Sequence, residues 1–585
     1  MLCGLVIPSS LINSSVEEFS YIGHNKSPFP FLMHIIIQSL GIIIIWPLCI
    51  YFLSGKNAKK IITITFLILT FISVINVFLF PGEYGFLTVM FKFSGSLSAS
   101  GIESFINITA LLITAFLVII IMFQYKKVIL SAAVIIAGSF IIVSAYNYIN
   151  IYFKYKNLNH QNVSVNVNSY EKKYNFSKDG KNVLIIMLDR AVNGLVPYVF
   201  EEKPELYKSY DGFTWYKNNV SYGIYTIFGL PSVFGGYEYT PFEIQKRSGI
   251  PLVDKHNEAL LMLPRIFSDI EYNVTVTDPS FANYRNNPDL DIFIPYPDIK
   301  ADNIIGKYNK LWLDNNNVVF ENDLTEIINS YLIRFSFLKI SPVIIRNFIY
   351  DGGMWLTVRK ENFSNTVLSN YIALDILPCI TNINDNSNNL NIVFNNLTHE
   401  NNNFFQAPDY IPVQDVTNIG SGYFANNKNY HVFIASIILL GKWFDYLKEN
   451  EIYDNTRIII ASDHGNMFIR IPDHITLPNR QYLEYITPLL MVKDFNDSGP
   501  LKTDNTFMTN ADVPLLALKS IIENPVNPWT GNKIKSDKEN GAVITSSLMY
   551  MFHRQQKNMF SIQNSEWLHV HTDIFNPANW SFFNP

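Results

Sequence analysis

Four long apolar segments in the first quarter of the chain constrain its fold more than any other feature. Each has about the 20 residues that a helix needs to cross the hydrocarbon core of a bilayer, and short loops separate them. One such segment would also suit a buried helix of a water-soluble protein, but four in succession predict a membrane-spanning region. The predicted spans are 30–53, 61–80, 106–125 and 128–147.

Lysines between these segments predict how the region is oriented. Lys56, Lys59 and Lys60 follow the first segment, and Lys126 and Lys127 follow the third. Short loops rich in lysine stay on the cytoplasmic side, so we expect both loops to be cytoplasmic and everything after the fourth segment to be outside. The sequence therefore predicts a multi-pass protein of the cytoplasmic or inner membrane, with an extracytoplasmic soluble domain.

The first residues, 1–12 (MLCGLVIPSSLI), are also apolar. They are too few to cross a bilayer, and they lack the basic region with which a signal peptide begins. We expect them to be the remnant of a further span, so that the intact protein would have five spans. Residues 1–147 are thus the predicted transmembrane region.

The remainder of the chain has the pattern of a covered parallel sheet. A polar, aperiodic linker is predicted at 148–180, a soluble domain at 181–535 and a C-terminal segment packed on it at 536–585. Within the domain, runs that are apolar throughout alternate with helical patterns, which predicts an α/β fold with a mostly parallel sheet sandwiched by helices. The expected strands are 182–188, 272–277, 390–396, 457–462 and 487–492, and the clearest helices are 255–270 and 430–450.

Composition excludes two kinds of binding site. The net charge of -5 argues against a basic surface, so no nucleic-acid partner is expected. Cys3, Cys49 and Cys379 are too few and too scattered for a disulfide framework or a cysteine-based zinc site. Any metal must therefore be held by Asp, Glu, His, Thr or Ser side chains.

Polar side chains follow three of the expected strands. Asp189 follows the first strand, His399 the third, and the pair Asp463 and His464 the fourth. Taken singly, each has a structural explanation, such as a turn carboxylate or a histidine bonded near a turn. Ligands of open α/β sheets bind beyond the carboxyl ends of the strands, and the occurrence of such residues at three ends of one sheet favours a metal site.

Four motifs, in this order, resemble the alkaline phosphatase and sulfatase superfamily. They are NVLIIMLD (182–189), YTIFGLPSVFGGYEY (225–239), NNLTHE (395–400) and YDNTRIIIASDHG (453–465). Membrane spans ahead of a soluble domain make the chain similar to the branch that contains lipoteichoic acid synthase and the lipid A phosphoethanolamine transferases. The resemblance covers roughly 180–495 and, more loosely, the spans.

The resemblance implies a metal site with a nucleophile. Asp189, Asp463 and His464 match metal ligands of the superfamily, and Thr226 matches both a fourth ligand and the nucleophilic threonine. Two carboxylates, one imidazole and one threonine oxygen suit Zn²⁺, and the oxygen-rich set would also accept Mn²⁺. A threonine hydroxyl is almost fully protonated at neutral pH, so it needs a base or a metal to activate it.

Thr226 is selected by its spacing, because it stands five residues before Pro231 as the nucleophile of the phosphoethanolamine transferases does. Ser221, Ser232 and Thr240 are nearby hydroxyls that remain alternatives.

Two histidines complete the implied site. His399 matches a substrate-side histidine of the superfamily, and His474 is a weaker candidate for a second. Either would suit proton transfer to a leaving group or from an acceptor.

One departure bears on the substrate. Sulfatases form their formylglycine from a Cys or Ser two residues before a proline, with an Arg after it, whereas Gly229 stands in that position here and no Arg follows. We therefore expect a metal-dependent transferase that moves a phosphoethanolamine or phosphoglycerol headgroup from a membrane lipid donor to an envelope glycan or lipid acceptor. A phosphodiesterase or sulfatase-like hydrolase and a non-catalytic envelope scaffold remain alternatives, and no oligomeric state is predicted.

The predicted orientation can be tested with a reporter fused after residue 150. Because both lysine-bearing loops are short and adjoin the spans, the fusion should report an extracytoplasmic location. Alkaline phosphatase and green fluorescent protein fusions, measured in parallel, give opposite signals in the two compartments. A cytoplasmic signal would overturn the orientation.

Overall fold

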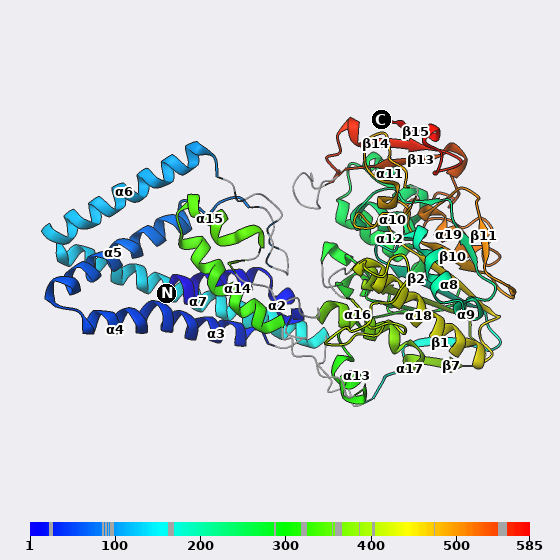
Figure 1. Cartoon of the computed structure of the whole chain (residues 1–585), viewed down its shortest axis with the longest axis horizontal. Coiled ribbons are helices and arrows are strands. Elements are labelled where there is room, and N and C mark those ends of the chain that lie inside the picture. The colour runs from blue at the N-terminus through cyan, green and yellow to red at the C-terminus, as the bar shows by residue number, and fades with distance from the viewer. Residues whose placement is uncertain are drawn as a thin grey trace. The chain divides into compact units, whose positions relative to one another are not determined.

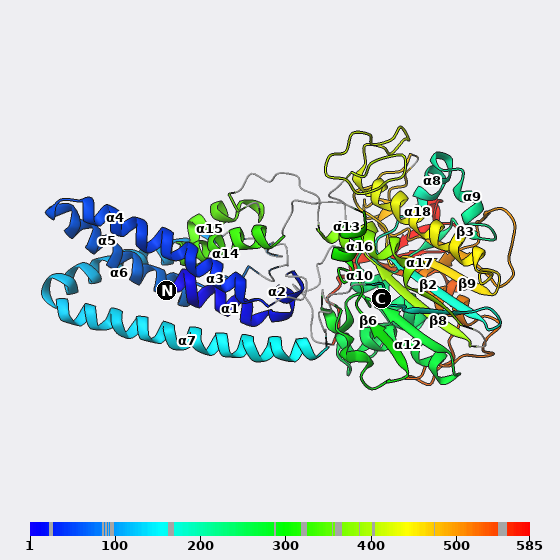
Figure 2. The ribbon, with the colours of Figure 1, turned by 90° about the horizontal axis from the view of Figure 1, so that it is seen from below.

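The computed structural model describes residues 1–22, 27–84, 87, 91, 93, 97, 99–161, 169–285, 288–316, 324–353, 355–356, 365–384, 387–399, 404–472, 474–547 and 558–584. The chain divides into two compact units, which Figures 1 and 2 show in ribbon form. The first contains Met1–Asn166 and Asn322–Lys360, and the second contains Val167–Glu321 and Glu361–Pro585. The chain therefore passes between the units at three places.

The first unit is helical. Among its described residues, four helices are long and apolar enough to cross a membrane, at Phe29–Leu53, Lys56–Phe78, Gly101–Gln124 and Lys126–Asn157. They overlap the four apolar segments of the sequence, and their outward faces expose many Ile, Leu and Phe side chains. The helices of this unit are α1 (Ile7–Ser14), α2 (Val16–Ile22), α3 (Phe29–Ser39), α4 (Trp46–Leu53), α5 (Lys56–Phe78), α6 (Gly101–Gln124), α7 (Lys126–Gln161), α14 (Leu324–Ile340) and α15 (Val343–Tyr350).

The structure differs from the expected domain bounds at two places. The predicted linker begins at 148, but α7 continues as helix to Gln161 because α1 and α2 pack against it, and Ile151 is fully buried. The predicted soluble domain, 181–535, is interrupted by Asn322–Lys360, which belongs to the helical unit. The apolar N-terminal residues form the short helical stretch Leu2–Ser14, and several of its side chains are buried.

The second unit is built on an eight-stranded sheet with the order β11-β3-β10-β9-β2-β8-β5-β6. The strands from β9 to β6 run parallel, whereas β10 runs antiparallel to both of its neighbours. The strands are β2 (Asn182–Leu188), β3 (Thr214–Tyr216), β5 (Asn273–Thr277), β6 (Ile299–Asp302), β8 (Asn389–Asn395), β9 (Thr456–Ala461), β10 (Leu490–Lys493) and β11 (Lys502–Asp504).

Helices cover both faces of this sheet, which confirms the predicted α/β fold class. Alternate residues of β2 enter two different cores, with Leu184, Ile186 and Leu188 on one face and Val183, Ile185 and Met187 on the other. The first face packs against α8 (Val196–Glu202), α9 (Leu206–Ser209), α13 (Asn309–Asn316), α16 (Asn365–Asp375), α17 (Leu377–Ile380) and α18 (Lys428–Glu449). The second packs against α10 (Thr226–Gly235), α11 (Pro241–Lys246), α12 (Leu252–Asp269) and α19 (Val513–Leu518).

Three smaller sheets are also present in the described part of this unit. Two are parallel pairs, β1 (Tyr174–Ser177) with β7 (Thr381–Asn384) and β4 (Asn219–Val220) with β12 (Met508–Thr509). The third is antiparallel and consists of β13 (Ala542–Thr545), β14 (Trp567–Val570) and β15 (Trp580–Phe582). Its buried residues pack with residues from 220–224 and 477–486, so the last part of the chain is joined to the second unit.

Candidate metal centre

The carboxyl ends of β2 and β9 bring the predicted ligands together. The two strands pair in parallel, so Asp189, directly after β2, lies beside Asp463, two residues beyond β9. The Asp189 amide donates to the carbonyl of Asn395 at the end of β8, 3.1 Å away. The Thr398 hydroxyl donates to the Asp189 carbonyl at 2.5 Å, which fixes the backbone that carries this carboxylate.

Asp189, Asp463 and His464 form a buried cluster of metal-ligand type, with one ligand atom from each within 4.8 Å of the others. His464 Nε2 lies 3.7 Å from Asp189 Oδ1 and 3.6 Å from Asp463 Oδ2. Around a tetrahedral Zn²⁺, bond lengths near 2.0–2.1 Å place neighbouring ligand atoms about 3.4 Å apart. The two distances from His464 Nε2 are therefore close to the spacing that such an ion requires.

Hydrogen bonds leave the inward-facing atoms of His464 and Asp463 available for a cation. The ring Nδ1 of His464 donates to the Gly465 carbonyl at 2.7 Å, so the lone pair of a neutral ring is on Nε2. Burial lowers the pKa of His464 more than the Asp463 carboxylate raises it. Asp463 Oδ1 accepts from the amides of Arg190 and His464, whereas its buried Oδ2 has no hydrogen-bond donor among the described residues. The residues present thus fit a divalent metal ion.

Thr226 is the first residue of α10 and reaches the same cluster. Its Oγ1 lies 3.4 Å from His464 Nε2, and its side chain is buried. The amides of Phe228 and Gly229 bond to the Tyr225 carbonyl, whereas the first amides of a helix have no acceptor within it. The start of α10 therefore offers N–H groups and the positive end of a helix dipole beside the Thr226 hydroxyl.

Two glycines allow the backbone approaches that hold this arrangement. A Cβ at Gly229 would lie 2.1 Å from the Asp463 carbonyl oxygen, and one at Gly465 would lie 1.9 Å from the Glu484 carbonyl oxygen. Asn510 bridges the first contact, because its side-chain amide donates to the carbonyls of Asp463 at 2.8 Å and Gly229 at 3.3 Å. The position of α10 relative to the end of β9 is therefore set by direct backbone packing.

The two predicted substrate-side histidines lie in different surroundings. His399, after β8, has an exposed side chain, and its carbonyl accepts a hydrogen bond from the Arg190 guanidinium at 3.3 Å. His474 is exposed and packs on the Tyr482 ring; within the described part of the chain it makes no hydrogen bond or ion pair with the metal cluster.

Arg190 is a site residue that the sequence analysis missed. Its backbone is left-handed, with φ of 66°, and its amide donates to Asp463 Oδ1 at 3.0 Å. Such a conformation at a non-glycine residue costs about 1–3 kcal/mol and is typical of functional sites. Its guanidinium stacks on the Phe468 ring at 4.8 Å. The sequence signal was an arginine directly after the strand-end aspartate.

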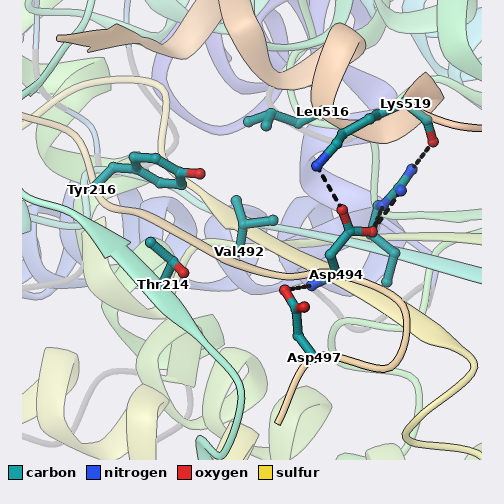
Figure 3. Close-up of a pocket in the computed structure, with 8 residues that line it drawn as sticks. Thr214, Tyr216, Val492, Asp494, Asp497, Leu516 and Lys519 are labelled. Carbon is teal, nitrogen blue, oxygen red and sulfur yellow. Dashed lines mark hydrogen bonds and ion pairs between the residues drawn. The ribbon is translucent and has the colours of Figure 1, made fainter. Parts of the chain in front are cut away.

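The pocket drawn in Figure 3 lies at the other end of the sheet, lined by Thr214, Tyr216, Arg457, Val492, Asp494, Asp497, Leu516 and Lys519. Arg457 is the second residue of β9, whereas the metal cluster lies beyond its last residue. Asp494 pairs with Arg457 at 2.6 Å and with Lys519 at 2.9 Å, so these charges are already compensated. We assign this pocket no part in the proposed chemistry.

No protein-family model matches the chain, and no curated protein matches it. Similar solved structures include a protein of the alkaline phosphatase superfamily from Vibrio parahaemolyticus, 12% identical, with a TM-score of 0.36, covering 72% of this chain and 85% of that chain. A lipoteichoic acid synthase from Listeria monocytogenes is 12% identical, with a TM-score of 0.33 and coverage of 68% and 86%. An integral membrane lipooligosaccharide phosphoethanolamine transferase from Neisseria meningitidis is 12% identical, with a TM-score of 0.29 and coverage of 72% and 71%. The similarity is one of fold.

Removing His464 should empty the metal centre. His464→Ala leaves three of four ligands, and we expect metal affinity to fall by at least about 100-fold, because even residues that only support a ligand contribute 10–100-fold. Metal content of the purified protein, measured by plasma mass spectrometry, gives the answer, with the exposed His474→Ala as the matched control. Unchanged metal content in a folded His464→Ala protein would show that this residue has a purely structural role.

Gly229 provides a second test, of the packing that carries Thr226. We expect Gly229→Ala to cost about 1–3 kcal/mol of stability, since the added methyl meets rigid backbone rather than a movable side chain, and to lower metal affinity by displacing α10. Gly249→Ala is the matched control, because a Cβ there meets nothing within 4 Å. Thermal unfolding with and without added Zn²⁺ measures both effects; equal behaviour of the two variants would contradict the packing model.

Proposed function

We propose that the protein is a membrane-anchored, metal-dependent phosphotransferase that moves a phospho-headgroup from a membrane lipid to a cell-envelope acceptor. The observation that carries this proposal is the position of the Thr226 hydroxyl, 3.4 Å from His464 Nε2 and at the start of a helix. A hydroxyl held beside a metal-ligand cluster is suited to form a covalent intermediate. A cluster without such a hydroxyl would favour hydrolysis by water.

Asp189, Asp463, His464 and Thr226 are the residues that would hold the metal, with Zn²⁺ favoured and Mn²⁺ also compatible with these ligands. When bound, the ion would supply Lewis acidity, which lowers the pKa of the threonine hydroxyl and offsets the charge of a phosphoryl oxygen. The amide groups at the start of α10 are oriented to bind another phosphoryl oxygen. These groups together would orient phosphorus for attack by Thr226.

The proposed reaction has two displacements at phosphorus. In the first, a bond forms from Thr226 Oγ1 to phosphorus, the bond from phosphorus to the lipid alcohol breaks, and the threonine proton ends on that alcohol. In the second, the hydroxyl of the acceptor replaces Thr226 on phosphorus and the threonine regains a proton. His399, whose side chain is exposed after β8, is the candidate to receive the proton of the acceptor.

The four apolar helices support a lipid as the donor. They would keep the second unit attached to the bilayer, where a lipid substrate is concentrated in two dimensions. The acceptor, a glycan or lipid of the envelope, is proposed from the resemblance of the sequence motifs. We place the second unit on the extracytoplasmic side, as the lysine-bearing loops predict.

Replacing Thr226 tests the proposal directly. Thr226→Ala should reduce turnover by at least about 10³-fold because the nucleophile is lost, while Asp189, Asp463 and His464 still bind metal. Thr226→Ser should keep part of the activity, because it retains the attacking oxygen. Headgroup transfer from a fluorescent phospholipid, followed by thin-layer chromatography, measures turnover. Intact-protein mass spectrometry detects the intermediate, in which the whole phospho-headgroup is bound to the protein.

The neighbouring hydroxyls are the controls for this experiment. Ser221 donates to the Gly223 carbonyl at 2.8 Å, and Ser232 is fully buried, so Ser221→Ala and Ser232→Ala should keep the covalent intermediate. If one of these variants lost activity while Thr226→Ala remained active, the nucleophile would be that residue and not Thr226. If release of headgroup to water persists in all of them, the protein is a hydrolase.

A further inference from the structure

Two helices that interrupt the soluble part of the sequence belong to the helical unit. α14 and α15 lie between α13 and α16 along the chain, yet they pack against α3, α5 and α6. Figures 1 and 2 both show them in green beside the blue helices of the N-terminal region. The helical unit is therefore completed by a segment that hydropathy does not identify as a span.

The charged residue of α15 faces the protein interior and several of its apolar residues are exposed, which is the opposite of the pattern expected in water. Its inward face carries Val343, Arg346 and Tyr350, all buried, and Arg346 is 0% exposed. Its exposed residues are mostly apolar, with Ile344 58% and Phe348 71% exposed, and include one uncharged polar residue, Asn347. A helix at the surface of a water-soluble protein presents charged residues outward and apolar residues inward. Outward apolar and inward charged residues are instead typical of protein in lipid.

The Arg346 guanidinium is fully satisfied inside the protein. Its five N–H groups donate to the carbonyls of Asn76, Phe80, Lys339 and Ser341 and to the Tyr84 hydroxyl, at 2.7–3.2 Å. Asn76 and Lys339 lie in the last turns of α5 and α14, where a cation is stabilised by unbonded carbonyls and the helix dipole. Arg346 thus joins α15 to the carboxyl ends of two other helices.

Two buried asparagines fix the level of α15 along α5 and α6. Asn76 of α5 donates to the Ile340 carbonyl at 2.8 Å, and Asn107 of α6 donates to Asn76 at 3.0 Å. Asn107 also accepts from the amide of Val343 at 3.1 Å, at the start of α15. The contact therefore lies near the last turn of α5 and the second turn of α6, at the end of α5 that is remote from Lys56, Lys59 and Lys60.

An aromatic cluster closes the same end of the unit. The Trp355 indole donates to the Phe91 carbonyl at 2.8 Å, and the Tyr350 hydroxyl accepts from the Phe93 amide at 2.9 Å. The rings of Phe91, Phe93 and Tyr350 all lie within 6.3 Å of the Trp355 ring, measured between centroids. Aromatic side chains are enriched where a bilayer meets water.

The outward face of α15 continues an apolar surface of α6. At the same level, in the first two turns of α6 and shortly before the buried Asn107, this helix exposes Ile102 and Phe105, at 75% and 72%. If α6 crosses a bilayer, the surface beside it must also be apolar, and α15 packs on α6 with Ile344 and Phe348 outward. A bilayer is the environment that suits the exposed apolar side chains of both α6 and α15.

We propose that α15 is a lipid-contacting helix, with Ile344, Ile345 and Phe348 among the acyl chains of the leaflet opposite Lys56, Lys59 and Lys60. This rests on the membrane location proposed above. The soluble sequence would then return to the bilayer between α13 and α16 and would be held there by Arg346.

Site-directed fluorescence on the full chain tests this. Cys3, Cys49 and Cys379 are first replaced with alanine, and single cysteines are then placed at positions whose residues are exposed: Phe348→Cys in α15, Phe116→Cys in the middle of α6 and Ser565→Cys in the second unit. Each is labelled with an environment-sensitive dye and placed in phosphatidylcholine–phosphatidylglycerol nanodiscs. At position 348 we expect blue-shifted emission that spin-labelled acyl chains quench, as at 116, and no such effect at 565.

The control positions separate the two ways in which the test can fail. Emission at 348 like that at 565, with 116 quenched, would overturn the role of α15 and leave the spans intact. Absence of quenching at both 348 and 116 would overturn the membrane location itself, and the role of α15 with it. Ile344→Cys repeats the measurement at an independent position on the same face and must agree with 348.

Discussion

Asp189, Asp463 and His464 direct two carboxylate oxygens and one ring nitrogen at a common point inside the second unit, and burial makes that arrangement costly. Removing a charge from water without a partner costs several kcal/mol even after the protein relaxes. Two backbone amides compensate Asp463 Oδ1, but its Oδ2 faces His464 Nε2 instead. A divalent cation at that point would remove the repulsion among all three groups at once.

The metal-ligand cluster is held in place by contacts between backbone segments that leave no room for a Cβ atom. α10 meets the end of β9 at Gly229, and the loop after β9 meets the Glu484 carbonyl at Gly465. Asn510 bonds to both sides of the first contact. Because Thr226 begins α10, the same packing determines where its hydroxyl lies. A site held by a helix and two strands keeps its geometry more closely than a site carried by loops alone.

The sequence predicted those features that a local pattern of apolar and polar residues determines. Apolar runs located the buried strands, and strand direction then implied that Asp189, Asp463 and His464 share an edge. Thr226 required the family resemblance, because nothing in its local pattern distinguishes it from Ser221 or Ser232. Arg190 was missed because its role depends on a left-handed backbone that turns its amide toward a residue 273 positions away. The arginine directly after Asp189 was visible in the sequence, but the contact of its amide with Asp463 was not.

The placement of α14 and α15 was missed for a related reason. A span is recognised by about 20 apolar residues in succession, whereas α15 has eight residues and carries an arginine. The arginine would argue against membrane contact if it faced outward, and it is compatible with lipid only because five neutral acceptors surround it.

The same compensation holds the middle segment of the chain within the helical unit. The chain passes between the two units at three places, and Asn322–Lys360, the segment between the second and the third, is held by buried polar bonds rather than by apolar packing alone. Removing one member of such a bonded group leaves its partner buried without a bond, which costs more than the bond itself contributed. The position of α15 within the helical unit therefore depends on Arg346, Asn76 and Asn107 together.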